Sequence, residues 1–206
     1  MLDVRKKGNY IKVDGMTFSL GNAKLSSRTL IWSIAPGKDY SCRQSCPGCY
    51  AMNLFRRYPG VKDCWIKNYE TVRDNPDRIV TAIKAIIEAY GDYFDQVRVH
   101  TAGEFFSEEY AQAWNKAAEI LQAAGKQVYS YTKNEDVLPF LGNINVVRSW
   151  VPGHGFNFGP AQSIERLARE RNLPICPATQ DHQGPIICGD NCRTCINEQF
   201  VLFIKH

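Results

Sequence analysis

The chain has 206 residues, eight of them cysteine, and its 25 basic and 21 acidic residues give a net charge of +4. This length suits one domain, or one domain with a small appendage. The charge is only mildly basic and gives no support for nucleic-acid binding. No stretch approaches the ~20 consecutive apolar residues of a membrane span, so we expect no membrane association. The basic residues Arg5, Lys6 and Lys7 precede no apolar run, so we expect no signal peptide and a cytoplasmic protein.

Strands and helices are expected to alternate along the chain. Asp14-Gly15 lies between two alternating segments and predicts a hairpin turn. Isoleucines spaced at i, i+4, i+7 and i+8 from Ile79 predict an amphipathic helix. Pro59-Gly60 is interpreted as a helix stop. The expected elements, in chain order, are a hairpin over 10–20, a strand over 29–34, helices over 49–58 and 77–90, a strand over 96–100, a helix over 107–124, a strand over 127–131, a short helix over 135–141, a strand over 145–150, a helix over 160–171, and short strands over 173–176 and 199–204.

This alternation predicts an α/β fold in which helices connect parallel strands, as in an open doubly wound sheet or part of a (βα) barrel. We expect a partial (βα) barrel of about five to six parallel strands, with an N-terminal β-hairpin and a small Cys-rich C-terminal lobe. The predicted boundaries are 1–28 for the hairpin extension, 29–176 for the barrel and 177–206 for the lobe packed on it.

A C-x3-C-x2-C loop follows the first predicted strand of the barrel and is formed by Cys42, Cys46 and Cys49. Thiolate is the soft ligand that iron–sulfur clusters require, and short spacings let one loop wrap one cluster. Three thiolates are one too few to close a four-iron cube, so the fourth iron would stay open to another ligand. Tetrahedral zinc is the alternative, with Cys64 as a candidate fourth ligand.

The same spacing occurs again near the end of the chain. Cys188, Cys192 and Cys195 repeat it, and Cys176 lies upstream as a candidate fourth ligand. Four thiolates predict a closed site, either a second [4Fe-4S] cluster or a structural zinc ion. A disulfide framework is disfavoured, because a chain of this length does not need cross-links to stabilise its core.

Polar residues follow the predicted parallel strands, where α/β folds bind their ligands. The first cysteine loop follows one strand, and the next three strands are followed, in chain order, by Gly103 and Glu104, by Thr132 and Asn134, and by Arg148 and Ser149. The carboxyl ends of parallel strands meet at one edge, so we expect a single site above the sheet.

A C-x3-C-x2-C loop after the first strand and a Gly-Glu pair after the second resemble the radical S-adenosylmethionine (SAM) superfamily. The resemblance implies that Cys42, Cys46 and Cys49 bind a [4Fe-4S] cluster and that SAM chelates its open iron. Reductive cleavage of SAM then gives a radical that abstracts hydrogen from a substrate. The resemblance also implies an electron donor such as a flavodoxin or ferredoxin.

The same resemblance implies roles for the residues at the strand ends. Gly103 and Glu104 would meet the SAM amino group. Thr132 and Asn134 would line the site, and Arg148 or Ser149 would hold the ribose. The run from Trp32 to Ala51 also looks like a group of phage-encoded proteins, the gene product eighty-eight type, which implies the host cytoplasm.

Three functions stay open at this point. The first is a radical SAM-like enzyme. The second is an iron–sulfur electron carrier or sensor, which is favoured by Gly48 where the superfamily usually has an aromatic residue, and by the absence of an adenine-binding glycine motif. The third is a zinc-stabilised binding protein. The sequence identifies neither a substrate nor a catalytic residue.

Overall fold

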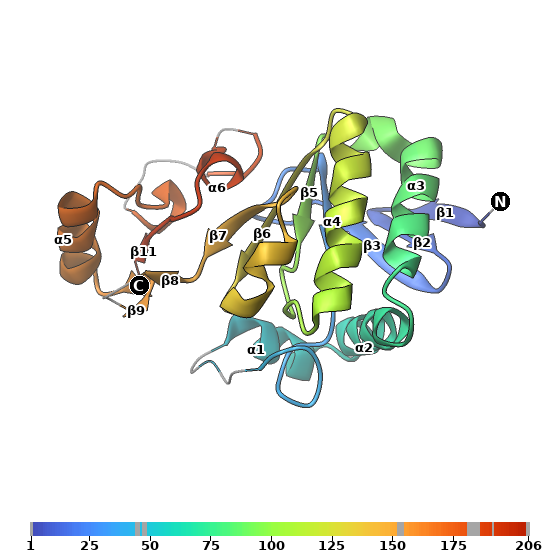
Figure 1. Cartoon of the computed structure of the whole chain (residues 1–206), viewed down its shortest axis with the longest axis horizontal. Helices are drawn as coiled ribbons and strands as arrows, with labels where there is room; N and C mark the ends of the chain where they lie inside the picture. The colour runs from blue at the N-terminus through green and yellow to red at the C-terminus, as the bar shows by residue number, and fades with distance from the viewer. Residues whose placement is uncertain are drawn as a thin grey trace.

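The computed structural model describes residues 2–43, 46, 49–151, 155–180, 186–190 and 192–204, and side chains throughout these ranges except at 150, 151, 155 and 156. A seven-stranded mixed sheet forms its centre, and its strands lie side by side in chain order (Figure 1). These strands are β1 (Val4–Lys7), β2 (Tyr10–Val13), β3 (Met16–Leu20), β4 (Thr29–Trp32), β5 (Gln96–Val99), β6 (Gln127–Thr132) and β7 (Asn145–Arg148).

The N-terminal half of the sheet is antiparallel. The predicted hairpin is confirmed: β2 pairs with β3 across Asp14-Gly15, whose φ angles are 50° and 78°. Positive φ at both turn residues is the geometry that a two-residue hairpin requires. The sequence did not predict β1, which pairs with β2. Because β3 also pairs with β4, the hairpin continues the main sheet.

The other half is parallel, from β4 through β5 and β6 to β7. The expectation of five to six parallel strands is therefore wrong for the described residues, where four strands form the parallel part. The predicted strand over 173–176 is reduced to one bridge between Ile175 and Leu202. The remaining strands form two small ribbons, β8 (Trp150–Val151) with β9 (Gly155–Phe156), and β10 (Phe158–Gly159) with β11 (Phe203–Ile204).

One face of the sheet is covered by helices α3 (Arg78–Tyr90) and α4 (Glu108–Ala123), both predicted (Figure 1). Ile79, Ile83 and Ile86 of the isoleucine stripe are fully buried, and Ile87 is partly buried at its edge. Ser107 caps α4 by accepting a hydrogen bond from the Tyr110 amide at 3.2 Å. A short 3₁₀ turn, η1 (Gly91–Tyr93), follows α3. A second one, η2 (Glu135–Phe140), follows strand β6.

Helix α2 (Pro59–Asp74) was not predicted. Pro59-Gly60 was interpreted as a stop, and α1 (Tyr50–Arg57) does end there. Proline is equally suited to the first turn of a helix, because its missing N–H would have no intrahelical partner. Pro59 accordingly begins α2 directly after the extended residue Tyr58.

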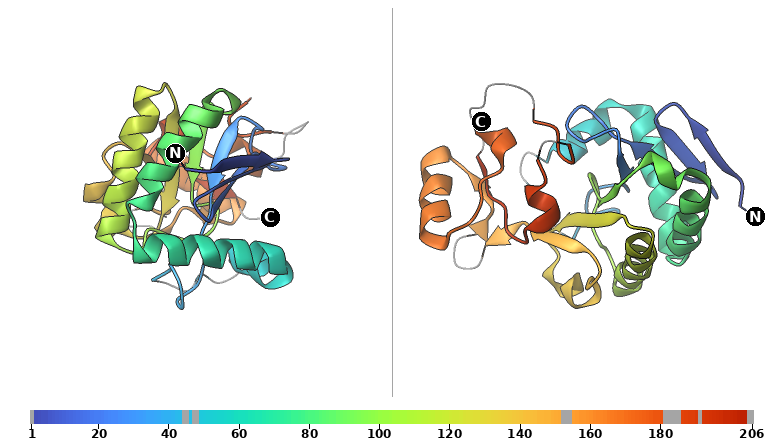
Figure 2. Two further views of the ribbon diagram at one scale, coloured as in Figure 1. Left: turned by 90° about the vertical axis from the view of Figure 1, so that its right-hand side faces the viewer. Right: turned by 90° about the horizontal axis from the view of Figure 1, so that it is seen from above.

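Part of the C-terminal segment packs on the other face of the sheet at β6 and β7, and the rest extends beyond the β7 edge (Figure 2). Side chains alternate along β6, so that Val128 lies in the core with α3 and α4 whereas Tyr129 lies in a second cluster with Cys176 and Cys195. This segment holds α5 (Ala161–Arg171), η3 (Pro177–Thr179) and α6 (Thr194–Asn197), of which α6 packs on β6 and β7. None of the helices in the described ranges is long and apolar enough to cross a membrane.

Asn68 fixes α2 to the sheet and supplies a test of this packing. Its buried side chain accepts a hydrogen bond from the Thr17 amide and donates to the carbonyls of Thr17 and Ser33, all at 2.9 Å. We expect Asn68→Ala to lower the free energy of unfolding by about 2–4 kcal/mol, because it leaves buried backbone groups unpaired. Urea unfolding measures the change. The exposed Asn53→Ala should stay within ~0.5 kcal/mol, and equal losses in both variants would contradict the assignment.

Candidate functional site

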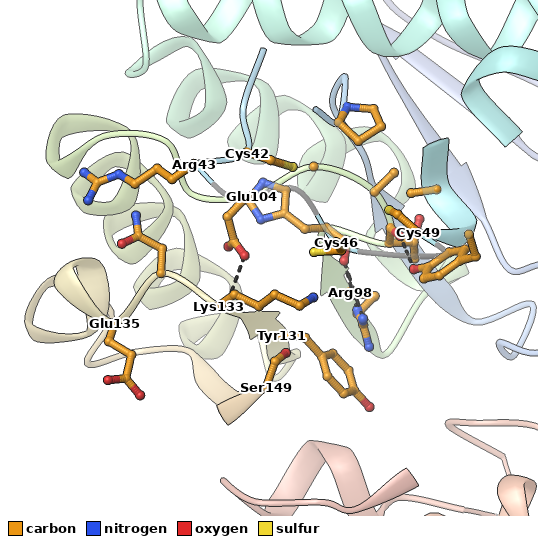
Figure 3. Close-up of a pocket in the computed structure, with 18 of the residues that line it drawn as sticks. Cys42, Arg43, Cys46, Cys49, Arg98, Glu104, Tyr131, Lys133, Glu135 and Ser149 are labelled. Carbon is orange, nitrogen blue, oxygen red and sulfur yellow. Dashed lines mark hydrogen bonds between the residues drawn. The ribbon is translucent and has the colours of Figure 1, made fainter. Parts of the chain in front are cut away.

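A pocket of ≈ 730 Å³ lies at the carboxyl ends of the parallel strands. Figure 3 shows Cys42, Cys46 and Cys49 along one side and Tyr131 and Ser149 along the other. Such strand ends are where α/β folds bind their ligands. The complete lining is Pro36, Cys42, Arg43, Cys46, Cys49, Tyr50, Ala51, Arg98, His100, Thr101, Ala102, Gly103, Glu104, Tyr131, Lys133, Asn134, Glu135, Asp136, Ser149 and Phe203.

The structure brings most of the predicted site residues together. Besides the three cysteines, the lining includes Gly103, Glu104, Asn134 and Ser149. Thr132 lies behind this wall and donates a hydrogen bond to Glu104 at 2.6 Å. Arg148 is the exception, because its guanidinium lies over the Phe200 ring, 5.4 Å from the centroid, and does not line the pocket.

The first cysteine loop is held by backbone hydrogen bonds. The Cys42 amide donates to the Gly37 carbonyl at 3.0 Å, and the Cys49 amide donates to the Cys46 carbonyl at 3.2 Å. Cys49 is the N-cap residue of α1. Burial raises the pKa of the Cys42 thiol, and the charges of Glu104 and Cys49 add to the effect. Gly48, the site of the expected departure from the superfamily pattern, lies outside the described residues.

Glu104 is a buried carboxylate that joins two strand ends. It accepts hydrogen bonds from the Phe105 amide at 3.0 Å, the Thr132 hydroxyl at 2.6 Å and the Lys133 amide at 2.9 Å. Burial raises its pKa, while these donors and the Lys133 charge act in the opposite direction. It does not cap α4, whose cap is Ser107. A carboxylate has about four acceptor positions, so one remains for a ligand.

Ser41 ties the cysteine loop to this carboxylate. Its hydroxyl donates to the Ala35 carbonyl at 2.7 Å and accepts from the Glu104 amide at 3.1 Å. Gly103 permits the approach, since its φ is +86° and an added Cβ would lie 2.4 Å from Cγ1 of Ile34. The Gly-Glu pair is therefore required by the backbone packing as well as being available to a ligand.

His100 lies at the base of the pocket in a left-handed conformation, with φ of 62°. Its Nε2 shares a hydrogen bond of 2.9 Å with the Tyr110 hydroxyl, which also accepts from Nε1 of Trp32 at 2.8 Å. Its Nδ1 has no partner among the described residues. Burial, together with the charge of Arg98, lowers the pKa of His100 to about 3, so the ring is neutral at pH 7.

Arg98 also lines the pocket, although the sequence did not predict it as a site residue. Its guanidinium carbon lies 3.7 Å from the centroid of the Tyr131 ring and 5.2 Å from that of Tyr129. A signal was present, because Arg98 stands within a short strand of a parallel sheet, where both faces are usually covered and apolar. Lys133 and Tyr50 line the pocket too.

The C-terminal cysteines gather on the covered face of the sheet. Burial is the first cause that raises the pKa of Cys176, Cys188 and Cys195, and the charges of neighbouring thiols in the same group raise each of them further. For Cys195 the pKa rises to about 12. A bound metal ion would displace the thiol protons and would also neutralise the repulsion between neighbouring thiolates.

In the described ranges no three histidine, cysteine or acidic side chains converge closely enough to hold a metal ion. For the first cysteine loop or the C-terminal cysteines to bind a metal ion, their thiol side chains would therefore have to turn toward one another. Cys64, the candidate fourth ligand of the first loop, lies elsewhere: it lines a second pocket beside Lys12 and Thr17.

These features define a mixed α/β protein with a three-cysteine pocket at the ends of its parallel strands. The chain belongs to the gene product 88 family, whose family model matches residues 13–149. The family expected from the run between Trp32 and Ala51 is thereby confirmed. The match contains the first cysteine loop and ends before Cys176. Searches of curated proteins and of solved structures found no match.

The His100 pKa predicts how stability depends on pH. Above the ordinary value of 6.5 the ring is neutral in both the folded and the unfolded chain, so it has no effect. Below pH 6.5 the His100 ring is protonated in the unfolded chain, whereas in the folded chain it stays neutral down to about pH 3. Stability should fall by up to ~1.4 kcal/mol per pH unit from this group.

His100→Asn removes the titration and tolerates the left-handed backbone. Urea unfolding between pH 7 and 4.5 should give a shallower decline in this variant than in the wild-type protein. Parallel declines would show that another group is responsible.

Gly103→Ala tests the close approach of the strand ends. An alanine here adopts an unfavourable φ and meets the carbonyl of Ile34 at 2.8 Å, so we expect a loss of more than ~1–2 kcal/mol in thermal or urea unfolding. Gly142→Ala is the matched control, because its added Cβ meets nothing within 4 Å. A Gly103→Ala protein as stable as the Gly142→Ala protein would refute the steric argument.

Proposed function

We propose that the protein is an iron–sulfur protein with a radical SAM-like fold, in which Cys42, Cys46 and Cys49 hold a [4Fe-4S] cluster. The observation that carries the proposal is the meeting of these three cysteines with Glu104 in one pocket at the ends of parallel strands. When bound and reduced, the cluster would supply one electron, which breaks a C–S bond of SAM and leaves methionine and a deoxyadenosyl radical. A flavodoxin or ferredoxin in a reducing cytoplasm is the proposed electron donor.

The strand order supports this fold. Four parallel strands in chain order, with α3 and α4 on one face, support this part of the proposal, because a (βα) barrel is built from parallel strands in that order. In such a strip the ligand site lies at the carboxyl ends of the strands, as the pocket does here.

The donor set suits an open cluster. The pocket lining contributes three thiols, and Cys64 lies in a different pocket. Among the described residues no fourth cysteine lines the site, so one iron is left for a ligand from solution. Three thiolates and an open position are what chelation by SAM requires.

The remaining residues act by binding and positioning. Three donors hold the Glu104 carboxylate in place, and its free acceptor position suits the ammonium group of SAM. Asn134 is fixed by donating to the Phe105 carbonyl at 2.8 Å. Of the two candidates for a ribose hydroxyl, Ser149 is better placed, because it lines the pocket and Arg148 does not. Tyr131 and Phe203 line the pocket and add aromatic surface to it.

We further propose that Cys176, Cys188, Cys192 and Cys195 hold a second [4Fe-4S] cluster or a zinc ion. Their mutual effect on pKa supports this, because thiols that repel one another when charged are stabilised by a shared cation. The site would also fix the C-terminal segment on the sheet.

A second candidate function is electron transfer or sensing without SAM. It is favoured by the position of Tyr131, which lines the pocket, stacks under Arg98 and packs against the cluster that contains Cys176 and Cys195. Two metal centres so arranged would suit an electron carrier.

Electron paramagnetic resonance of the anaerobically purified, dithionite-reduced protein separates these functions. A four-iron signal that shifts on addition of SAM supports the enzyme. A signal that ignores SAM favours the carrier or sensor. Zinc without iron in metal analysis leaves a zinc-stabilised binding protein.

Cys46→Ala identifies the responsible loop. It should abolish the SAM-responsive signal and lower cluster occupancy by more than ~10-fold, because losing a ligand costs more than losing a supporting hydrogen bond does. Cys64→Ala is the control and should leave the signal intact, since Cys64 lies outside the pocket. A normal signal in Cys46→Ala would rule out this loop as the cluster site.

A further inference from the structure

Arg98 stands in the middle of β5, on the face of the sheet that the C-terminal segment covers. Its neighbours Val97 and Val99 point to the opposite face, into the core with α3 and α4. Arg98 is half-buried and keeps its charge, so a nearby negative charge or an aromatic face stabilises it.

No carboxylate lies within ion-pair distance of Arg98 in the part of the chain that the structure describes. Its Nε and Nη2 reach only the His100 carbonyl, at 3.5 and 3.4 Å. The guanidinium is stacked on Tyr131 at 3.7 Å, a cation–π contact that fixes its orientation. Stacking alone does not balance the charge.

The cysteines on either side are the available source of negative charge. Arg98 lines the pocket together with Cys42, Cys46 and Cys49 (Figure 3). On the other side its guanidinium lies over the rings of Tyr131 and Tyr129, at 3.7 and 5.2 Å from their centroids, and these rings pack in the cluster that contains Cys176 and Cys195. Tyr131 has the same double position, since it lines the pocket and also packs against the cluster that contains Cys176 and Cys195.

We propose that Arg98, clamped on Tyr131, is a positioning residue that neutralises thiolate charge on both sides of the sheet end, so that one cation supports both cysteine groups. This inference rests on the proposed function, because it presumes that the two groups bind metal. It makes the C-terminal group part of the same site as the pocket, where a remote structural site would need no such link.

Two consequences follow from the charge. A centre of four thiolates and one Zn²⁺ carries a net negative charge, so a neighbouring guanidinium favours its assembly. Removing a group of this supporting kind costs ~10–100-fold in metal affinity. A positive charge beside a cluster also favours its reduction, so its loss moves the midpoint potential to more negative values.

The first experiment isolates the C-terminal group in the full-length chain. Cys42, Cys46 and Cys49 are replaced by alanine, and Zn²⁺ affinity is measured by competition with a chromophoric chelator. Arg98→Gln should weaken Zn²⁺ binding by ~10–100-fold. Arg148→Gln is the matched control, because Arg148 also stacks on an aromatic ring of the C-terminal segment but does not line the pocket. It should change the affinity by less than ~2-fold, since its guanidinium lies over Phe200 and not over the Tyr131 ring that packs against the cysteine cluster.

Arg98→Lys separates charge from packing. It keeps the charge and loses the planar stacking surface, so it should retain most of the Zn²⁺ affinity. If Arg98→Gln fails to fold, as circular dichroism would show, the comparison of Arg98→Lys with Tyr131→Phe decides. Tyr131→Phe keeps the ring under the guanidinium and should leave the affinity within ~10-fold of the parent.

The second measurement concerns the pocket side. Redox titration of the first-loop cluster in the otherwise wild-type chain should show a more negative midpoint potential for Arg98→Gln and an unchanged one for Arg148→Gln. A merely structural role would not move the potential in this direction.

The outcomes separate the two proposals. A wild-type chain without bound metal defeats the proposed function and this inference together. Metal-bound protein in which Arg98→Gln matches the parent in Zn²⁺ affinity and potential defeats this inference alone. Equal weakening by Arg98→Gln and Arg98→Lys, or by Arg98→Gln and Arg148→Gln, also overturns it, because charge at this position would then not be the cause.

Discussion

The carboxylate of Glu104 and the hydroxyl of Ser41 join the ends of three neighbouring strands. Glu104 follows β5 and receives hydrogen bonds from two residues at the end of β6, while Ser41 links its amide to the Ala35 carbonyl beyond β4. A buried carboxylate is costly unless hydrogen-bond donors replace its lost hydration, and three donors from these loops do so, so the loops have to stay together. The first cysteine loop begins at the next residue, Cys42, and its position depends on this set of hydrogen bonds.

The sheet separates two environments with different chemistry. On one face, α3 and α4 form an apolar core with alternate residues of each strand. On the other face, the intervening residues meet tyrosines, cysteines and one arginine. Stability comes chiefly from the first face, where large apolar side chains are fully buried. The second face has fewer apolar contacts, and its charged and thiol groups are the ones that a metal would stabilise.

Local patterns predicted the elements that depend on local rules. The Asp14-Gly15 hairpin, the isoleucine helix and the Ser107 cap each follow from neighbouring residues alone. Proline at 59 has two local meanings, a helix stop and a helix start, and the sequence does not say which one applies. The convergence of Glu104 and Ser149 on one pocket followed from parallel strands, whereas Arg98 needed knowledge of which distant segment covers its face. Arg148 was misplaced for the same reason, since its direction depends on Phe200.

The order of the strands in the sheet equals their order in the chain. As the polypeptide leaves the ribosome, each new strand can therefore add to an edge that already exists, without waiting for a later partner. The pocket residues up to Ser149 emerge before the cysteines at 176–195 that cover the second face. Synthesis from the N-terminus thus separates the two cysteine groups in time. The first thiols are presented on an open sheet, and the cover arrives last.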